Sequence, residues 1–227
     1  MNYWIVTLTN FGDSAVLLPL AAVFTGWMMF ERAWRSVALW LALFVGAMVL
    51  VVGTKLAFIG WGLGIESLDF TGFSGHTMLS SSVYPSLLVW MAQRRGRNAQ
   101  VGAWLLGSAF AIAIGISRVV LHMHSSSEVV GGYVLGGTVS LLWAAASALD
   151  AKPHPYQFAV LMVIAVMVGS LHGQRAPTQG MITQVAMHLS GRTVPFNRYN
   201  AWPQHYRKPG SPSADMQVLW RPAAAPR

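Results

Sequence analysis

Long apolar segments, separated by short polar stretches, dominate the first three quarters of the chain. Six segments approach the length of about 20 apolar residues that a membrane-spanning helix needs. They cover residues 14–30, 36–59, 77–92, 101–117, 128–149 and 156–172. Residues 1–12, with Tyr3 and Trp4, are typical of a segment at the membrane interface. The pattern predicts an all-α polytopic membrane protein, with a six-transmembrane-helix bundle over residues 1–172.

The composition changes at about residue 173. Proline, glycine and basic residues recur from there to residue 227, and such stretches are typical of loops and turns. We therefore expect a mostly irregular extramembrane C-terminal tail over 173–227, with one short amphipathic helix at 180–189.

The overall composition agrees with a membrane protein. Of the 227 residues, 54% are hydrophobic and only 10% are charged, whereas soluble domains carry about 25% charged residues. Since the chain has no cysteine, disulfides and thiolate chemistry are excluded. The net charge of +8 fits membrane topology and anionic head groups better than nucleic acid. No basic region precedes the first apolar run, so we expect no cleavable signal peptide.

The charges of the connecting loops alternate along the chain. Basic residues gather in the loops at 31–35, 94–97 and 150–152, whereas the loops at 60–76 and 118–127 carry a single arginine and several serines and histidines. Because basic loops stay in the cytoplasm, the latter two loops are expected on the outer face of the membrane, together with both termini. Two loops that are distant in the sequence should therefore meet.

Small residues recur every four positions in two of the apolar segments. These are Gly107, Ala111 and Gly115 in one segment and Gly132 and Gly136 in the next. Such faces predict helices that pack closely.

The first polar cluster, Ser74-Gly75-His76, directly precedes an apolar segment. Ser74 is expected to cap the following helix, and the N–H groups at a helix start favour an anion. Gly75 would let a phosphate approach the backbone, and His76 could give a proton to a leaving oxygen. A capped helix with an interfacial histidine is the alternative interpretation.

The second polar cluster runs from Ser117 to Glu128 and also holds Arg118, His122 and His124. Arg118 offers planar donors that suit phosphate oxygens. His124 and Glu128 are four residues apart, so a helical turn would put them on one face. There the carboxylate can bind one imidazole nitrogen and leave the other as a nucleophile. We expect His122 and Ser117 to have supporting or structural roles.

Lys55 is the one charged residue within the second apolar segment, near its expected outer end. A lysine there either snorkels to the head groups or meets an anion. Because both polar clusters are expected on the same side of the membrane, we expect Lys55 to bind phosphate with them.

These residues resemble the signature motifs of the type-2 phosphatidic acid phosphatase superfamily. Phe73-Ser-Gly-His76 is similar to the second motif, Pro-Ser-Gly-His. Ser117-Arg-(five residues)-His124-(three residues)-Glu128 is similar to the third, Ser-Arg-x5-His-x3-Asp. Of the first motif, Lys-x6-Arg-Pro, only Lys55 is present, because Gly62 and Leu63 occupy the Arg-Pro positions.

The resemblance covers roughly residues 50–145 and implies a six-helix, metal-independent membrane lipid phosphatase without a cofactor. His124 would attack phosphorus and form a phosphohistidine, Glu128 would orient His124, and His76 would protonate the leaving group. The phosphate oxygens would be held by four residues: Lys55, Ser74, Gly75 and Arg118. The implied substrates are polyprenyl diphosphates, phosphatidate-type lipids or lipid A phosphates.

Two departures from the family pattern matter. Glutamate at position 128 is one methylene longer than the usual aspartate. The missing arginine of the first motif removes one phosphate clamp, for which Arg198 or Arg207 of the tail is a candidate substitute. Two other functions stay open: a lipid-phosphate carrier or flippase on the same fold, and a metalloenzyme with the ligands His76, His122, His124 and Glu128.

Overall fold

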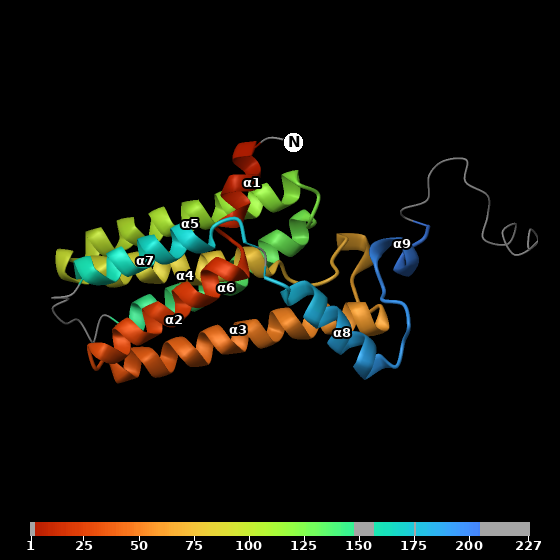
Figure 1. Ribbon diagram of the computed structural model, residues 1–227, viewed down its shortest axis with the longest axis horizontal. Helices are drawn as coiled ribbons and strands as arrows, with labels where there is room; N and C mark the ends of the chain where they lie inside the picture. The colour runs from red at the N-terminus through yellow and green to blue at the C-terminus, as the bar shows by residue number, and fades with distance from the viewer. Residues whose placement is uncertain (1–2, 148–156, 175, 205–227) are drawn as a thin grey trace, which may run out of the picture.

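The computed structural model describes residues 3–147, 157–174 and 176–204, and most of them are helical. The helices are α1 (Tyr3–Asn10), α2 (Ser14–Phe30), α3 (Trp34–Trp61), α4 (Gly75–Ala92), α5 (Arg97–Val120), α6 (Ser126–Ser147), α7 (Gln157–Leu171), α8 (Thr178–Ser190) and α9 (Arg198–Ala201), with short 3₁₀ turns η1 (Glu66–Leu68) and η2 (Gln93–Arg95). Helices α2 to α7 lie side by side along one long axis, whereas α1 runs across it (Figure 1). The expected all-α fold is confirmed.

Four stretches of the described chain are long and apolar enough to cross a membrane: Tyr3–Phe30, Trp34–Trp61, Arg97–Val120 and Ser126–Ser147. They support the expected membrane protein with transmembrane helices. Helix α4, with 18 residues, is not among these stretches, and α7 has only 15 residues. The count of six spans therefore stays a prediction, and the basic loop expected at 150–152 lies outside the described residues.

Helix α4 is the central helix, and this position allows it to carry several polar residues. It packs against α2, α5 and α6, and 13 of its 18 residues are buried. Since it faces protein rather than lipid, it can carry four serines, two of which donate to carbonyl oxygens within the helix: Ser81 to Thr77 and Ser82 to Met78. Burial by neighbouring helices thus replaces the hydrophobicity that a lipid-facing helix requires.

Glycines let α5 and α6 approach α4. A Cβ atom at Gly132 would lie 2.7 Å from the carbonyl oxygen of Ser74, and one at Gly136 would overlap the carbonyl oxygen of Met78. Gly107 of α5 is equally close to the α4 backbone. The predicted small-residue faces are confirmed, and they set the distance between the helices that start at the two polar clusters.

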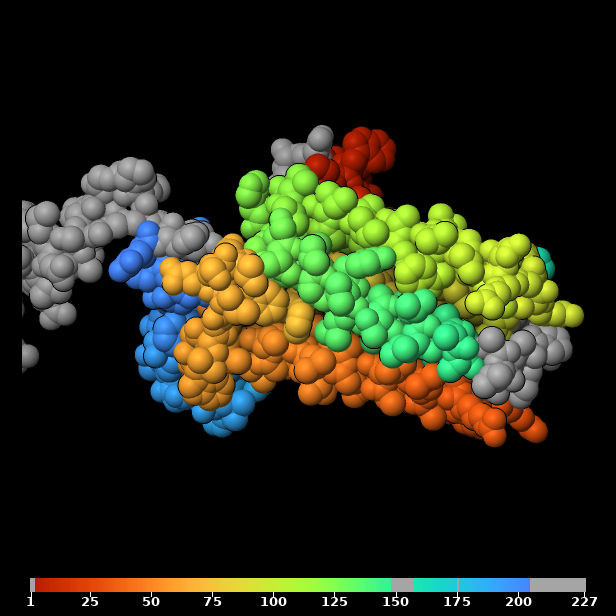
Figure 2. Space-filling model, turned by 180° about the vertical axis from the view of Figure 1, so that it is seen from behind, coloured from red at the N-terminus to blue at the C-terminus, as the bar shows by residue number. Residues whose placement is uncertain are grey.

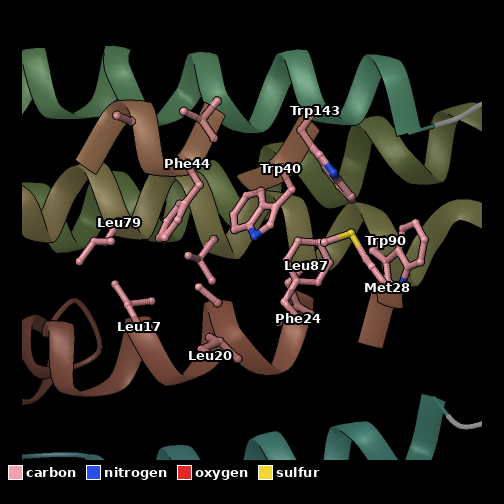
Figure 3. Close-up of a cluster of buried hydrophobic side chains, with 14 of the residues drawn as sticks. Leu17, Leu20, Phe24, Met28, Trp40, Phe44, Leu79, Leu87, Trp90 and Trp143 are labelled. Atoms are coloured by element: carbon pink, nitrogen blue, oxygen red, sulfur yellow. The ribbon is translucent and has the colours of Figure 1, made fainter. Parts of the chain in front are cut away.

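An aromatic cluster packs the end of the bundle away from the polar loops (Figure 3). The ring of Phe24 meets Trp40 and Trp143 edge to face, with centroid distances of 5.1 and 5.2 Å. Trp90 packs against Trp143 as well, and Trp143 Nε1 donates to the Ser36 carbonyl at 3.1 Å. Helices in lipid gain little from the hydrophobic effect, so such close packing and interhelical bonds hold the bundle together.

The two polar loops lie at the opposite end of the bundle, as the loop charges predicted. Helix α3 has 28 residues, or about 42 Å at 1.5 Å per residue, which exceeds a hydrocarbon core of about 30 Å. Its last turns provide a wall for the C-terminal segment, because α8 packs against α3. The backbone N–H of Phe196 donates to the Ile59 carbonyl at 2.9 Å, and the Trp202 ring lies 5.3 Å from that of Phe58.

The described part of the tail is thus a packed element of the fold. The helix expected at 180–189 corresponds to α8, and the loop at 62–74 lies beside the α8–α9 segment (Figure 2). Residues 176–204 contain α8 and α9, and the mostly irregular tail expected over 173–227 stays a prediction. Residues 205–227, including Arg207, lie outside the described residues.

Candidate active site

A pocket of about 590 Å³ lies where the two polar loops meet α2, α3 and α8. Seven ionisable side chains line it: Asp13, Lys55, His76, Arg118, His124, Glu128 and Arg198. Five of them were singled out in the two clusters and at position 55, from three distant parts of the sequence. The fold therefore brings the candidate site residues together.

The expected contact between His124 and Glu128 is present. His124 Nδ1 donates to Glu128 Oε2 at 2.6 Å. His124 lies in the turn before α6 and not on the helix itself. Because Nδ1 is held by the carboxylate, Nε2 is the nitrogen left to act as a nucleophile.

Glu128 also caps its own helix, which explains glutamate in place of aspartate. The Glu128 N–H donates to Ser125 Oγ at 3.4 Å, and the Ser125 N–H donates to Glu128 Oε2 at 3.2 Å. This reciprocal pair is a capping box, a motif that uses glutamate or glutamine at this position. The same oxygen accepts from His124, so the helix cap and the imidazole are positioned by one carboxylate oxygen.

The other carboxylate oxygen of Glu128 binds two distant segments. Oε1 accepts from the backbone N–H of Thr71 at 2.8 Å and from the Thr71 hydroxyl. Arg198 Nη2 lies 2.8 Å from the same oxygen, and Arg198 Nε donates to Asp69 at 2.8 Å. Glu128 is fully buried, and a buried carboxylate is stable only with such partners.

Burial and the neighbouring charges together set the protonation of His124. Burial lowers the pKa of the His124 imidazole below its usual range, and the hydrogen bond to Glu128 opposes this shift. Burial also lowers the pKa of Arg198, but Glu128 and Asp69 outweigh it and raise that pKa. The site therefore combines an imidazole whose neutral form is favoured by burial with a permanently charged guanidinium.

His76 lies in the first turn of α4, and Ser74 caps this helix as expected. Ser74 Oγ accepts from the Thr77 N–H at 3.5 Å. Ser74 itself is fully buried below the pocket, whereas Gly75 and His76 line it. His76 Nε2 lies 3.5 Å from Asp13 Oδ2. Both pocket histidines thus have a carboxylate partner.

The cations of the pocket come from three helices. Lys55 Nζ, on α3, donates to Gln179 Oε1 of α8 at 3.1 Å. Arg118 Nη1, at the end of α5, donates to Thr9 Oγ1 of α1 at 3.2 Å. With Arg198 of α9 they surround the histidines with positive charge, as an anion site requires.

His122 and Ser117 lie outside the pocket lining. His122 is exposed and has a left-handed backbone conformation, with φ of 54°. Ser117 Oγ donates to the Ile114 carbonyl at 2.6 Å, within α5. Both therefore shape the turn and the helix rather than face the pocket.

Part of the pocket wall is apolar. Side chains from α2, α3, α4 and α8 provide it: Leu18, Met48, Val51, Val52, Leu79, Met181 and Ile182. A polar end that suits an anion and an apolar wall that suits a hydrocarbon chain thus share one cavity.

Among the described residues, no three His, Asp or Glu side chains are grouped so that they could hold a metal ion. The four ligands of the metalloenzyme alternative do not converge, since His122 is exposed and each of the other histidines is paired with a carboxylate.

Sequence reasoning missed three residues that hold the site together: Asp13, Thr71 and Gln179. Asp13 gave one usable signal, because an Asp directly before an apolar run is a helix N-cap pattern. Thr71 and Gln179 gave none. Their contacts to Glu128 and Lys55 span 57 and 124 residues.

Fold and pocket together describe a helical membrane protein in which histidines and cationic side chains share one cavity with an apolar wall. A model of the PAP2 superfamily matches residues 60–151. The chain belongs to this superfamily.

Two known proteins are similar to this chain in sequence. An uncharacterized 22.5 kDa protein in the cps region of Klebsiella pneumoniae is 37% identical over 203 residues, which cover 87% of this chain and 96% of that protein. Phosphatidylglycerophosphatase B of Bacillus subtilis (strain 168) is 25% identical over 143 residues, or 60% of this chain and 70% of that protein. No solved structure matches. At the level of the family, these findings support a lipid phosphatase that acts in a membrane.

Proposed function

We propose that the protein hydrolyses a lipid phosphate or diphosphate through a phosphohistidine intermediate on His124. The hydrogen bond between His124 Nδ1 and Glu128 carries the proposal, because it leaves Nε2 as a nucleophile inside a cationic pocket. The candidate substrates are polyprenyl diphosphates, phosphatidate-type lipids and lipid A phosphates. The name of the Bacillus subtilis relative adds phosphatidylglycerophosphate.

The reaction would proceed in two steps. His124 Nε2 forms a bond to phosphorus while the bond to the leaving oxygen breaks, and His76 gives that oxygen its proton. Water then attacks the phosphohistidine, gives a proton to His76, and the P–N bond breaks to release phosphate and neutral His124. The cations would stabilise the charge on the phosphoryl oxygens.

Arg198 is our candidate for the missing first-motif arginine. It lines the pocket together with Lys55 and Arg118, and its charge is held next to the catalytic pair by Glu128 and Asp69. Gly75 completes the set by leaving room for a phosphate at the start of α4. We propose no metal ion and no cofactor in the reaction.

The apolar wall and the loop charges support the proposed location. A lipid chain would lie along the wall between α2, α3 and α8 while its head group meets the histidines. The basic loops at 31–35 and 94–97 favour the cytoplasm. We therefore propose a multi-pass protein of the bacterial inner membrane whose pocket faces the periplasm.

The test is phosphate release by the full chain in detergent, with a panel of five lipids: the four classes named above (polyprenyl diphosphates, phosphatidate, lipid A phosphates and phosphatidylglycerophosphate) and polyprenyl phosphates. We expect release from at least one, inhibition by vanadate, unchanged rates in chelator, and loss of activity to near background in His124→Ala. No release from any lipid would contradict the enzyme. Lipid transport that persists in His124→Ala would favour the carrier alternative. Loss of phosphate release in chelator would favour the metalloenzyme.

The role of Arg198 has its own test. Arg198→Ala is expected to raise KM and lower kcat together, because the cation acts on the phosphoryl group in the ground state and in the transition state. Arg192→Ala is the matched control, since Arg192 stacks on Phe196 and does not line the pocket. Truncation after Gly173 with unchanged hydrolysis would exclude any contribution of the tail.

A further inference from the structure

We propose that Asp13 is a positioning residue for the proton transfer by His76. The pocket contains a second histidine–carboxylate pair, formed by His76 Nε2 and Asp13 Oδ2 at 3.5 Å. This inference rests on the proposed phosphatase function. It assigns a role to a residue outside the three family motifs.

Backbone contacts hold the Asp13 carboxylate in place. Asp13 is the N-cap of α2, and its Oδ1 accepts from the Ala15 N–H at 2.8 Å and from the Ala176 N–H at 3.2 Å. Since Oδ1 is used in these contacts, Oδ2 is the oxygen directed at His76. The side chain is only 14% exposed, so water competes little for it.

The turn that carries Asp13 is also tied to the helix that carries His76. Tyr84 of α4 donates its hydroxyl to the carbonyl of Phe11, two residues before Asp13, at 2.8 Å. His76 and Tyr84 lie on the same helix, so the Tyr84 bond ties the turn that carries Asp13 to the helix that carries His76.

The pairing assigns the two nitrogens of His76. A carboxylate beside Nε2 favours the imidazolium form and leaves Nδ1–H as the proton for the leaving oxygen. As the P–O bond breaks, that proton moves to the leaving alkoxide and His76 becomes neutral. In the second step the neutral ring takes a proton from the attacking water, which restores the imidazolium on Asp13.

A positioning residue for a general acid has a specific signature. Protonation matters when the leaving group is a strong base, such as the alkoxide of a diacylglycerol. It matters little for a stabilised phenolate such as 4-nitrophenolate. The value of kcat/KM covers only the steps up to release of the first product, so it reports this protonation directly.

The experiment compares kcat/KM of Asp13→Asn with the wild type, as full chains in detergent, on phosphatidate and on 4-nitrophenyl phosphate. We expect a fall of about 10- to 100-fold on phosphatidate, part of the 10²- to 10⁴-fold effect of a general acid. On 4-nitrophenyl phosphate the change should stay below about threefold. His76→Ala should likewise lose more kcat/KM on phosphatidate than on 4-nitrophenyl phosphate. The double variant should lose little more kcat/KM than His76→Ala alone.

Two further variants separate positioning from folding. Asp13→Ser keeps an N-cap side chain for α2 but removes the carboxylate from His76, so it should behave like Asp13→Asn. Ser14→Ala is the matched control: it removes the Ser14–Thr178 hydroxyl contact, which also ties α2 to the C-terminal segment, without touching His76. The ratio of kcat/KM on phosphatidate to kcat/KM on 4-nitrophenyl phosphate should not change in Ser14→Ala.

The outcomes distinguish the two proposals. An equal loss on both substrates, or no loss on phosphatidate, in a folded Asp13→Asn protein would overturn the role of Asp13 while the phosphatase function stands. Failure of the wild type to cleave these substrates and the whole lipid panel would overturn the phosphatase function and this inference with it.

Discussion

Glu128 shows how one side chain serves both structure and chemistry. Its Oε2 completes the capping box with Ser125 and binds His124, while its Oε1 joins Thr71 and Arg198. The extra methylene relative to aspartate is what lets the carboxylate reach these partners from the first turn of α6.

Glu128→Asp restores the residue usual in the family, and we still expect it to impair this protein. The shorter arm cannot keep both the Ser125 N–H and His124 Nδ1, so kcat should fall about 10- to 100-fold, as for a misplaced catalytic group. Loss of the cap should cost about 1 kcal/mol of stability. Glu66→Asp, at an exposed glutamate, is the matched control. Equal activity of Glu128→Asp and wild type would contradict a role for the arm length.

The protonation of His124 predicts the acid limb of the pH–rate profile. The neutral imidazole is the nucleophile, and its fraction grows as the pH rises through the pKa. Because burial lowers that pKa from 6.5, half-maximal kcat/KM should lie below pH 6.5. Glu128 raises this pKa while Lys55 and Arg118 lower it, so Glu128→Gln should move the limb to still lower pH at a reduced maximum. A limb that moves to higher pH in Glu128→Gln would contradict this assignment.

Among elements, the contact of α6 with α4 decides where the two polar clusters meet. Glycine on α6 lets the helices approach, and the Ser74 N–H at the start of α4 donates to the Glu128 carbonyl at 3.0 Å. Widening this contact would separate His76 from the His124–Glu128 pair.

Two neighbouring glycines of α6 test this contact. Gly136→Ala should destabilise the protein by about 1–3 kcal/mol, because its Cβ would overlap the Met78 carbonyl oxygen. Gly137→Ala should be neutral or stabilising by about 0.5–1 kcal/mol, because its Cβ would meet only Tyr133, at 3.9 Å, and alanine favours a helix. Thermal unfolding in detergent measures both. Equal midpoints for the two variants would show that the helices can adjust.

Across the whole molecule, both polar loops and the α8–α9 segment gather at one end of the bundle (Figure 1). The turns at 31–33 and 93–96 lie at the other end. The charge pattern predicts which end faces the cytoplasm. Because the chain has no cysteine, a single introduced cysteine can be labelled specifically.

Two single-cysteine variants test the orientation. Ser67→Cys is exposed beside the pocket and Asn98→Cys is exposed at the opposite end. In intact spheroplasts, a membrane-impermeant maleimide should label Ser67→Cys, and it should label Asn98→Cys only after permeabilisation. The reverse pattern would place the pocket in the cytoplasm.

Much of this protein could be predicted from patterns that act over a few residues. Long apolar segments predicted the helices, Ser74 predicted the start of α4, and the spacing of His124 and Glu128 predicted their contact. The loop charges predicted that two distant loops share one end. Each of these patterns depends on residues close together in the sequence or on how a short segment interacts with the membrane. A local stretch of sequence is therefore enough to recognise it.

The sequence by itself thus determined the class of protein, the helices and the two histidines of the site. Only the tertiary structure decided which partners those histidines and cations have. Asp13 meets His76 across 63 residues, and Arg198 meets Glu128 across 70. Contacts of this kind depend on the path of the loops and on how closely the helices pack, and no local pattern specifies either.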